Sequence, residues 1–175
     1  MKEIPLKDAY QLVEPGPTTL LTTRHEGRAN VMTLSWHMVV DFTPRLACVV
    51  SEANFSHAAL RATGECVIAI PDVGLAAKAV EIGNCSGREV RKFEAFGLTP
   101  KPAHKVGAPL VAECFANLEC RVVDAQLADT YNLFILEVVM AWRDPRKKAP
   151  KTIHHQGYGR FIVDGETIEL PSNMP

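Results

Sequence analysis

Strand-forming segments dominate this chain and do not alternate with helices, which restricts its fold more than any other feature. The two longest, Cys114 to Ala125 and Asn132 to Trp142, are apolar and are joined by a turn near Ala128-Asp129. About six to eight strands and two or three short helices are expected in all, and a closed antiparallel barrel accommodates them best. The sequence therefore predicts a mainly β fold with helices at the edges of the barrel, and not a doubly wound parallel sheet.

The other predicted strands are short, and turn residues separate them. Glu26-Gly27 and Asp164-Gly165 are typical turn pairs, so each is expected to close a hairpin. Segments rich in β-branched and apolar residues lie between such turns, as is usual for strands. These shorter strands are expected at Thr18 to Thr23, Ala29 to Leu34, Arg45 to Ser51 and Glu65 to Ile70, with a last hairpin over Arg160 to Leu170.

Helix boundaries are marked by capping residues. Ser56 is a good N-cap, and Gly64 follows the same segment as a C-terminal stop. Gly83 ends a second apolar segment in the same way. The helices are expected over Ser56 to Thr63, Leu75 to Ile82 and Glu89 to Phe96.

The composition is that of one globular domain covering residues 1–175. Hydrophobic residues make up 47% of the chain and charged residues 22%, which is enough apolar material for a sizeable core. The formal net charge of −1 provides no general attraction to nucleic acid or to anionic lipid. We therefore expect neither nucleic acid nor a membrane as a partner.

The location is predicted from what the sequence lacks. Residues 1–10 have no apolar core typical of a signal peptide, and no apolar run approaches the roughly 20 residues that span a bilayer. The five cysteines are an odd number and form no CxxC pair. Reduced thiols in the cytoplasm are the simplest interpretation.

Two polar segments could together hold a ligand that has a flat ring at one end and a phosphate at the other. A phosphate favours the N–H groups at a helix N-terminus, which Asn54-Phe55-Ser56-His57 would provide. A ring edge favours amide donors and acceptors in a row, which the strand end from Asn30 to Ser35 would provide. Simpler interpretations stay open, since Ser56 could be only a cap and the strand only a strand. Apolar neighbours such as Met32 and Trp36 could cover the ring or belong to the core.

The loop Gly83-Asn84-Cys85-Ser86-Gly87-Arg88 is a third candidate segment, with Lys92 shortly after it. Its glycines would let the backbone approach a ligand, but their spacing fits neither a Rossmann nor a P-loop fingerprint. Cys85 could be a nucleophile only if His154 or His155 served as its base, and no spacing supports that pair. A metal site is disfavoured because no paired-ligand spacing appears, so we expect none.

From about Pro15 to Leu170 the ordered motifs NVMTLSW, DFTP, NFSHAALRATGE, GNCSGREVRKFEAFGL and YNLFILEVV resemble the flavin reductase-like family, of flavoredoxin type. The resemblance implies an FMN-binding split β-barrel that forms homodimers with FMN near the subunit interface. It also implies FMN as the cofactor and NAD(P)H as a possible reductant.

Residue roles follow from the resemblance, motif by motif. Asn30, Val31, Met32 and Thr33 would line the isoalloxazine edge, largely through backbone groups, with Ser35 beside them. The ribityl phosphate would be held by Ser51, Asn54, Ser56 and His57, and the ring or phosphate would be covered by Cys85, Ser86 and Lys92. The chain departs from the family in having Ala69 at a position where many relatives have Asn. It also has no basic residue near Glu52, so Lys92 or Arg88 would have to balance the phosphate.

The leading hypothesis is an FMN-binding oxidoreductase that passes reducing equivalents from NAD(P)H to a flavin or protein acceptor. Because the hard chemistry belongs to the cofactor, no catalytic acid or base side chain is expected. The alternatives are an FMN-containing electron carrier that does not react with NAD(P)H, and a non-catalytic flavin-binding module. Replacing Ser56 with Ala is expected to weaken FMN binding more than riboflavin binding, because only FMN has the phosphate.

Overall fold

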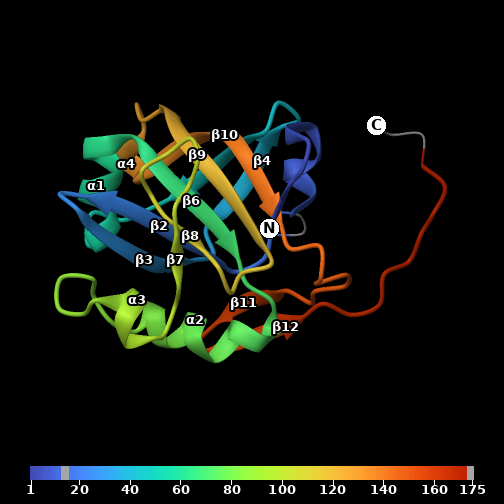
Figure 1. Ribbon diagram of the computed structural model, residues 1–175. Helices are drawn as coiled ribbons and strands as arrows, with labels where there is room; N and C mark the ends of the chain where they lie inside the picture. Colours follow the sequence, from blue (N-terminus) through green and yellow to red (C-terminus); the bar gives the residue numbers. More distant parts are fainter. Residues whose placement is uncertain (13–15, 173–175) are drawn as a thin grey trace.

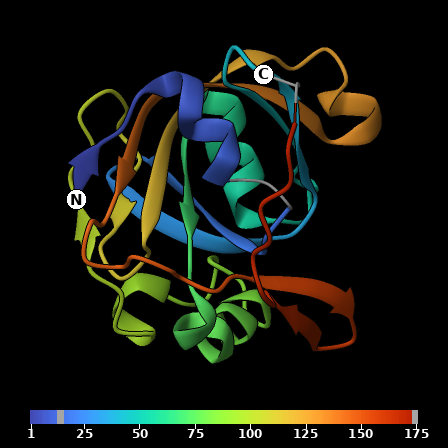
Figure 2. The ribbon, with the colours of Figure 1, turned by 90° about the vertical axis from the view of Figure 1, so that its right-hand side faces the viewer.

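The computed structural model describes residues 1–12 and 16–172, and it consists mainly of one curled antiparallel sheet (Figures 1 and 2). The strand order is β3-β2-β6-β9-β10-β5-β4, with β1 also pairing with β10. These strands are β1 Lys2–Glu3, β2 Thr19–His25, β3 Arg28–Leu34, β4 His37–Asp41, β5 Arg45–Val49, β6 Glu65–Ile70, β9 Ala116–Asp124 and β10 Leu133–Arg143. The mainly β, antiparallel prediction is confirmed. Pro15, where the family resemblance was expected to begin, lies outside the described residues.

The two long predicted strands form the centre of the barrel. β9 and β10 pair antiparallel, with Leu136 opposite Val122 and Trp142 opposite Asn117. Alternate side chains of β10 point inward, so Phe134 and Leu136 are fully buried in the core. The connection contains a short helix, α4 Ala128–Tyr131, which ends at Asn132 with a left-handed φ of 57°. Asparagine tolerates this conformation better than most residues do.

A second layer lies below the barrel and packs on its outer face (Figures 1 and 2). An apolar cluster that includes Val31, Ala79, Ile82 and Phe93 joins this layer to the sheet. The layer contains α2 Ala76–Gly83, α3 Lys92–Ala95, β11 Ile153–Gly157 and β12 Arg160–Val163. The remaining helices and short strands of the molecule are η1 Leu6–Leu12, α1 Phe55–Thr63, η2 Val73–Leu75, β7 Pro100–Lys101 and β8 Leu110–Val111. Among the described residues, no helix is long and apolar enough to cross a membrane.

Ser56 is not the N-cap of α1, so this part of the prediction is wrong. The helix begins one residue earlier, with Asn54 in the N-cap position and no side-chain capping bond. Ser56 lies inside the first turn and is fully buried, because its hydroxyl accepts a hydrogen bond from the Asn30 side-chain amide of strand β3. The predicted stop at Gly64 is confirmed by its φ of 64°.

Three other predictions differ from the structure. The third helix is only one turn long, Lys92–Ala95, because the chain before it is held in turns around Ser86. The last hairpin is formed by β11 and β12 and turns at Tyr158-Gly159, and not at Asp164-Gly165. The Asp164 carboxylate instead accepts hydrogen bonds from the N–H and hydroxyl of Thr152, which fix Asp164 beside the start of the hairpin. The edge strand β4 was not predicted.

Candidate functional site

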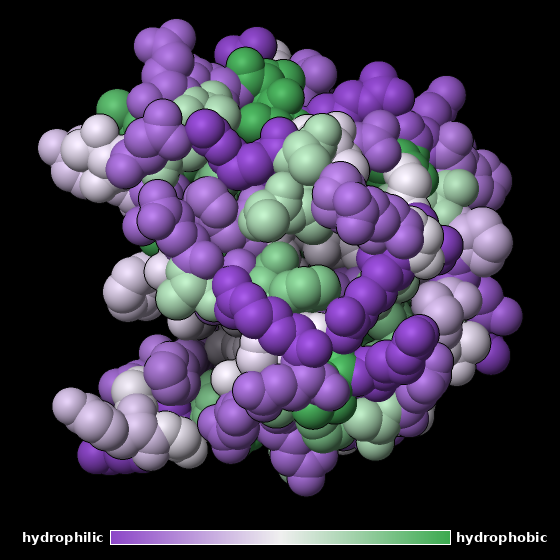
Figure 3. All heavy atoms as spheres, turned by 90° about the vertical axis from the view of Figure 1, so that its left-hand side faces the viewer, coloured by the Kyte–Doolittle hydropathy of each residue, from purple (hydrophilic) through white to green (hydrophobic). Residues whose placement is uncertain are grey.

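A groove runs between the barrel and the lower layer, at the edge strand β3. It consists of two adjoining cavities of about 190 Å³ and about 280 Å³, which share the lining residues Thr33, Gly83 and Asn84. In Figure 3 the outline of the molecule is hollowed at its left edge, between the barrel above and the lower layer. The combined space is in the range that cofactor sites occupy.

Strand β3 forms one wall of the groove. It is the last strand in the sheet order, so among the described residues its outer edge has no strand partner. The side chains of Asn30, Met32 and Thr33 line the first cavity, and Ser35 lines the second. Val31 is on the face of β3 opposite to Asn30 and Met32 and on the same face as Thr33, and it packs into the apolar cluster with Ala79 and Ile82 of α2. The Thr33 hydroxyl donates to the backbone oxygen of Ala79, which ties α2 to this wall.

The N-terminus of α1 forms the end of the first cavity. Ala53, Asn54 and Phe55 line it, and the first N–H groups of a helix have no partners within the helix. The Ser51 hydroxyl accepts a hydrogen bond from the Ala53 N–H at 3.3 Å. The Asn54 N–H also donates to Ser51, to its backbone oxygen at 2.8 Å, so the donors that the helix presents to the cavity are the N–H groups of its first two residues, Phe55 and Ser56.

Two predicted phosphate ligands point away from the cavity. The Ser56 hydroxyl accepts a hydrogen bond from the Asn30 side-chain amide at 2.9 Å and another from the Thr23 hydroxyl at 3.4 Å. The His57 ring packs edge-on against Phe134, with ring centroids 5.5 Å apart. Both side chains support the site from beneath, and neither lines it.

The loop from Gly83 to Lys92 covers the groove from the other side. Gly87 packs so closely that an added Cβ would lie 2.7 Å from the Cδ1 atom of Phe55 and would also overlap the Asn30 amide. The Ser86 hydroxyl accepts from the Arg88 N–H at 3.2 Å, and the Lys92 ammonium donates to the Ile82 backbone oxygen at 2.7 Å. Burial lowers the pKa of Lys92. Cys85 is half-buried, and its thiol lies 3.8 Å from the same Ile82 oxygen.

Two arginines bind this loop to the start of α1. Arg28 donates to the Gly87 backbone oxygen, and its guanidinium lies 4.8 Å from the centroid of the Phe55 ring. Arg88 donates to the Ala53 backbone oxygen at 2.8 Å. Sequence reasoning named Arg88 as a substitute cation but missed Arg28. The signal was present, because Arg28 precedes Asn30 by two residues on a strand and so lies on the same face.

The histidines of β11 do not pair with Cys85. His154 Nε2 lies 2.7 Å from the Asp164 carboxylate, while His155 lines the second cavity with Phe161. The ring centroids of His155 and Phe161 are 5.1 Å apart. Within residues 1–12 and 16–172, no group of three or more His, Cys, Asp or Glu side chains could hold a metal ion.

The donor set fits flavin mononucleotide. Helix N–H groups lie at one end, where a phosphate near −2 in charge would be stabilised. Arg28 and Arg88 do not line the cavity, but they donate to the backbone oxygens of Gly87 and Ala53, which do. An unpaired strand edge and apolar side chains, including Met32 and Phe55, lie along the groove, where a ring would need hydrogen bonds and cover. The buried Thr18 hydroxyl lines the second cavity and has no hydrogen-bond partner in the described part of the chain.

Comparisons with known proteins agree with this assignment. The family model described as flavin reductase like domain matches residues 13–161. The chain is 33% identical to the protein YddH of Escherichia coli K12 over 180 residues, which cover 94% of this chain and 95% of that protein.

Two solved structures have the same fold. One is the FMN-binding domain of a flavin reductases-like enzyme from Shewanella baltica, with a TM-score of 0.91, 28% identity and 97% of each chain covered. The other is the flavoredoxin of Desulfovibrio vulgaris, with a TM-score of 0.80, 24% identity and 91% and 92% of the two chains covered. The predicted antiparallel split barrel and the predicted resemblance are both confirmed.

Proposed function

The chain belongs to the flavin reductase-like domain family, and from this premise we propose that it binds FMN in the groove and passes electrons from NAD(P)H through FMN to a flavin or protein acceptor. The observation that carries the proposal is the groove itself, which joins an unpaired strand edge to a helix N-terminus with two arginines close behind its rim. Residues 1–175 would then form a single flavin-binding domain.

Each wall of the groove would have a distinct task. The backbone of Asn30 to Thr33 would orient the ring edge, while Met32 and Phe55 would exclude water from it. The start of α1, with Arg28 and Arg88, would hold the phosphate. The residues proposed to contact the cofactor line the groove, and they are Asn30, Met32, Thr33, Ser35, Asn54, Cys85, Ser86 and Lys92. Val31, Ser51, Ser56 and His57 would support these residues from outside the cavity, and Arg28 and Arg88 would add positive charge at the phosphate end.

Bound FMN would supply hydride acceptance and electron transfer, so the protein would contribute binding, orientation and exclusion of water. Donors near the pyrimidine edge of the ring would stabilise negative charge there. We propose no catalytic acid or base among the side chains.

We propose that the protein acts as a homodimer in the cytoplasm. Strand β4 is at the other end of the sheet order, and the alternating residues at and beside it, Trp36, Met38 and Val40, are 71%, 62% and 45% exposed. A row of exposed apolar side chains on an edge strand is usually covered by a partner. All five cysteines are free, which suits a reducing compartment.

The second candidate function is an FMN-containing electron carrier that a protein partner reduces. The β11–β12 hairpin borders the groove and exposes Tyr158 fully at its turn, with Ile162 52% exposed, so a partner could dock beside the cofactor. Such a carrier would need no access for a nicotinamide.

Anaerobic mixing of the FMN-loaded protein with NADH and, separately, with NADPH distinguishes these functions. Rapid bleaching of the yellow absorbance with either nucleotide supports the oxidoreductase. Persistent colour with both nucleotides, followed by bleaching with dithionite, contradicts direct NAD(P)H turnover and favours the carrier. A non-catalytic module would retain FMN but transfer no electrons to any acceptor after chemical reduction.

A further inference from the structure

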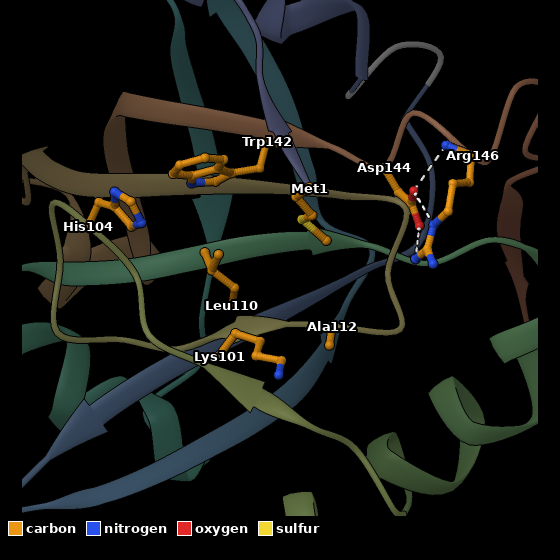
Figure 4. Close-up of a pocket in the computed structure, with 8 residues that line it drawn as sticks. All are labelled: Met1, Lys101, His104, Leu110, Ala112, Trp142, Asp144 and Arg146. Carbon is orange, nitrogen blue, oxygen red and sulfur yellow. Dashed lines mark hydrogen bonds and ion pairs between the residues drawn. The ribbon is translucent and has the colours of Figure 1, made fainter.

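A separate cavity of about 360 Å³, which we call the Trp142 cavity, shares no lining residue with the groove (Figure 4). Its aromatic end is formed by Trp142 and His104, and Leu110 lies across from the indole ring. Lys101, Asp144 and Arg146 form its charged end. Its size is typical of a site for a small molecule.

A buried carboxylate builds the aromatic wall. Glu119 is fully buried, and its carboxylate oxygens accept three hydrogen bonds. The donors are Trp142 Nε1 at 2.8 Å, the backbone N–H of His104 at 3.0 Å and the backbone N–H of Lys105 at 2.6 Å. A buried charge is unfavourable unless several donors satisfy it. Here the donors come from β10 and from the loop after β7, so the carboxylate fixes both walls. The Trp142 and His104 rings meet edge to face, with centroids 4.7 Å apart.

The charged end contains the Lys101 ammonium, and the α-ammonium of Met1, which also lines the cavity, adds a second positive charge near Asp144. Arg146 binds Asp144 with two parallel hydrogen bonds, of 3.0 and 2.9 Å, so these two charges compensate each other. In the described part of the chain, no hydrogen bond or ion pair reaches the Lys101 ammonium. This amine lies on the same side of the cavity as Ala112, away from His104 (Figure 4).

We propose that this cavity binds a small aromatic monocarboxylate. The ring would lie between the face of Trp142 and Leu110, where an aromatic ring gains more than a saturated one. The carboxylate would pair with the Lys101 ammonium, which no carboxylate neutralises in the described part of the chain. The indole N–H is already bonded to Glu119, so it is not needed as a ligand donor. This site is independent of the flavin groove.

The test uses the protein as purified, labelled with ¹⁵N, and titrated with phenylacetate. The chain has two tryptophans, Trp36 and Trp142, so the indole N–H region of the spectrum reports the site directly. Trp142→Phe assigns the two signals. We expect saturable shifts of the Trp142 signal, with a Kd below about 1 mM for a ligand of this size, and no shift of the Trp36 signal.

Two isosteric ligands separate the ring from the charge. Phenylacetamide, which lacks the charge, should bind at least about fivefold more weakly than phenylacetate. Cyclohexylacetate, which lacks the aromatic ring, should also bind more weakly. Equal affinity of the acid and the amide, or tighter binding of cyclohexylacetate, would overturn the proposed ligand class.

Variants locate the site. Lys101→Gln should weaken phenylacetate about fivefold and leave phenylacetamide unchanged, whereas Lys151→Gln, at an exposed lysine outside the cavity, should change neither. Ala112→Phe should fill the cavity and abolish binding while thermal unfolding stays cooperative. The proposal would be refuted if the Trp142 signal did not shift at a phenylacetate concentration tenfold above about 1 mM. Unchanged phenylacetate binding by folded Ala112→Phe would refute it as well.

Discussion

The flavin groove and the Trp142 cavity show two different ways in which one barrel builds a binding site. The groove is lined by runs of neighbouring residues from β3, the start of α1, the loop from Gly83 to Lys92 and the β11–β12 hairpin, and most of its donors are backbone groups and small polar side chains. The Trp142 cavity is lined by single residues from separate segments, and one buried carboxylate holds its aromatic walls together. Polar donors suit a nucleotide, and aromatic walls beside an unpaired lysine suit a small acid.

The same difference explains what the sequence could predict. The groove was found because Asn30 to Ser35, Asn54 to His57 and Gly83 to Arg88 are contiguous motifs with a recognisable chemistry. The Trp142 cavity was missed because His104, Glu119 and Trp142 lie on separate segments and form no motif. Strand pairing and packing alone bring them together.

The fold was predictable where local signals agreed with packing. The long strands, the first hairpin and the stop at Gly64 follow from apolar patterning and turn residues. The start of α1 was predicted one residue too late, because a serine is common both as an N-cap and as a buried hydrogen-bonding residue. Ser56 is buried here because its hydroxyl accepts a hydrogen bond from the Asn30 side-chain amide. The turn of the last hairpin was predicted wrongly because Asp164 is bound to Thr152, a tertiary contact that the local sequence does not indicate.

The largest expected difference between the two sites comes from removing the Glu119 carboxylate, which supports the Trp142 cavity and not the groove. Glu119→Ala should lower the free energy of unfolding by about 3–5 kcal/mol, because it leaves buried N–H donors without partners. Chemical denaturation measures the loss. Glu137→Gln, at a half-buried position on the neighbouring strand β10, should cost less than about 0.5 kcal/mol. A loss of FMN binding by folded Glu119→Ala would contradict the independence of the two sites.

The groove should be most sensitive at Gly87. Gly87→Ala forces a methyl group against Phe55 and the Asn30 amide, so we expect a stability loss of about 1–3 kcal/mol and clearly weaker FMN binding. Gly165→Ala is the matched control, since its added Cβ would meet nothing within 4 Å. Differential scanning calorimetry and flavin titration give the two readouts. Unchanged FMN affinity in Gly87→Ala would exclude the loop from the site.

The phosphate end is tested more selectively by Arg28 than by Ser56, whose hydroxyl points into the barrel. Arg28→Gln should weaken FMN about three- to tenfold and leave riboflavin nearly unchanged, because only FMN carries the phosphate. Arg24→Gln, at an exposed position on the paired strand β2, controls for long-range charge. Equal losses for both flavins would place Arg28 at the ring and not at the phosphate.

The smallest expected effect concerns the hairpin that borders the groove. Burial alone would raise the pKa of Asp164, but hydrogen bonds from Thr152 and His154 outweigh it and lower this pKa. A lowered carboxyl pKa stabilises the fold above the unfolded value of about 3.9 and loses this contribution as the pH falls through the folded value. Asp164→Asn should therefore cost about 1 kcal/mol at pH 6 and progressively less below pH 4. A cost that does not depend on pH would contradict the ionised pairing.

The account depends most on FMN binding in the groove with its phosphate at the start of α1. Isothermal titration of the flavin-free protein with FMN and with riboflavin tests this directly. We expect one FMN per chain, bound at least about tenfold more tightly than riboflavin, since the helix N-terminus would bind the phosphate and the two nearby arginines would add positive charge. No heat with either flavin, or equal affinity for both, would contradict the central claim.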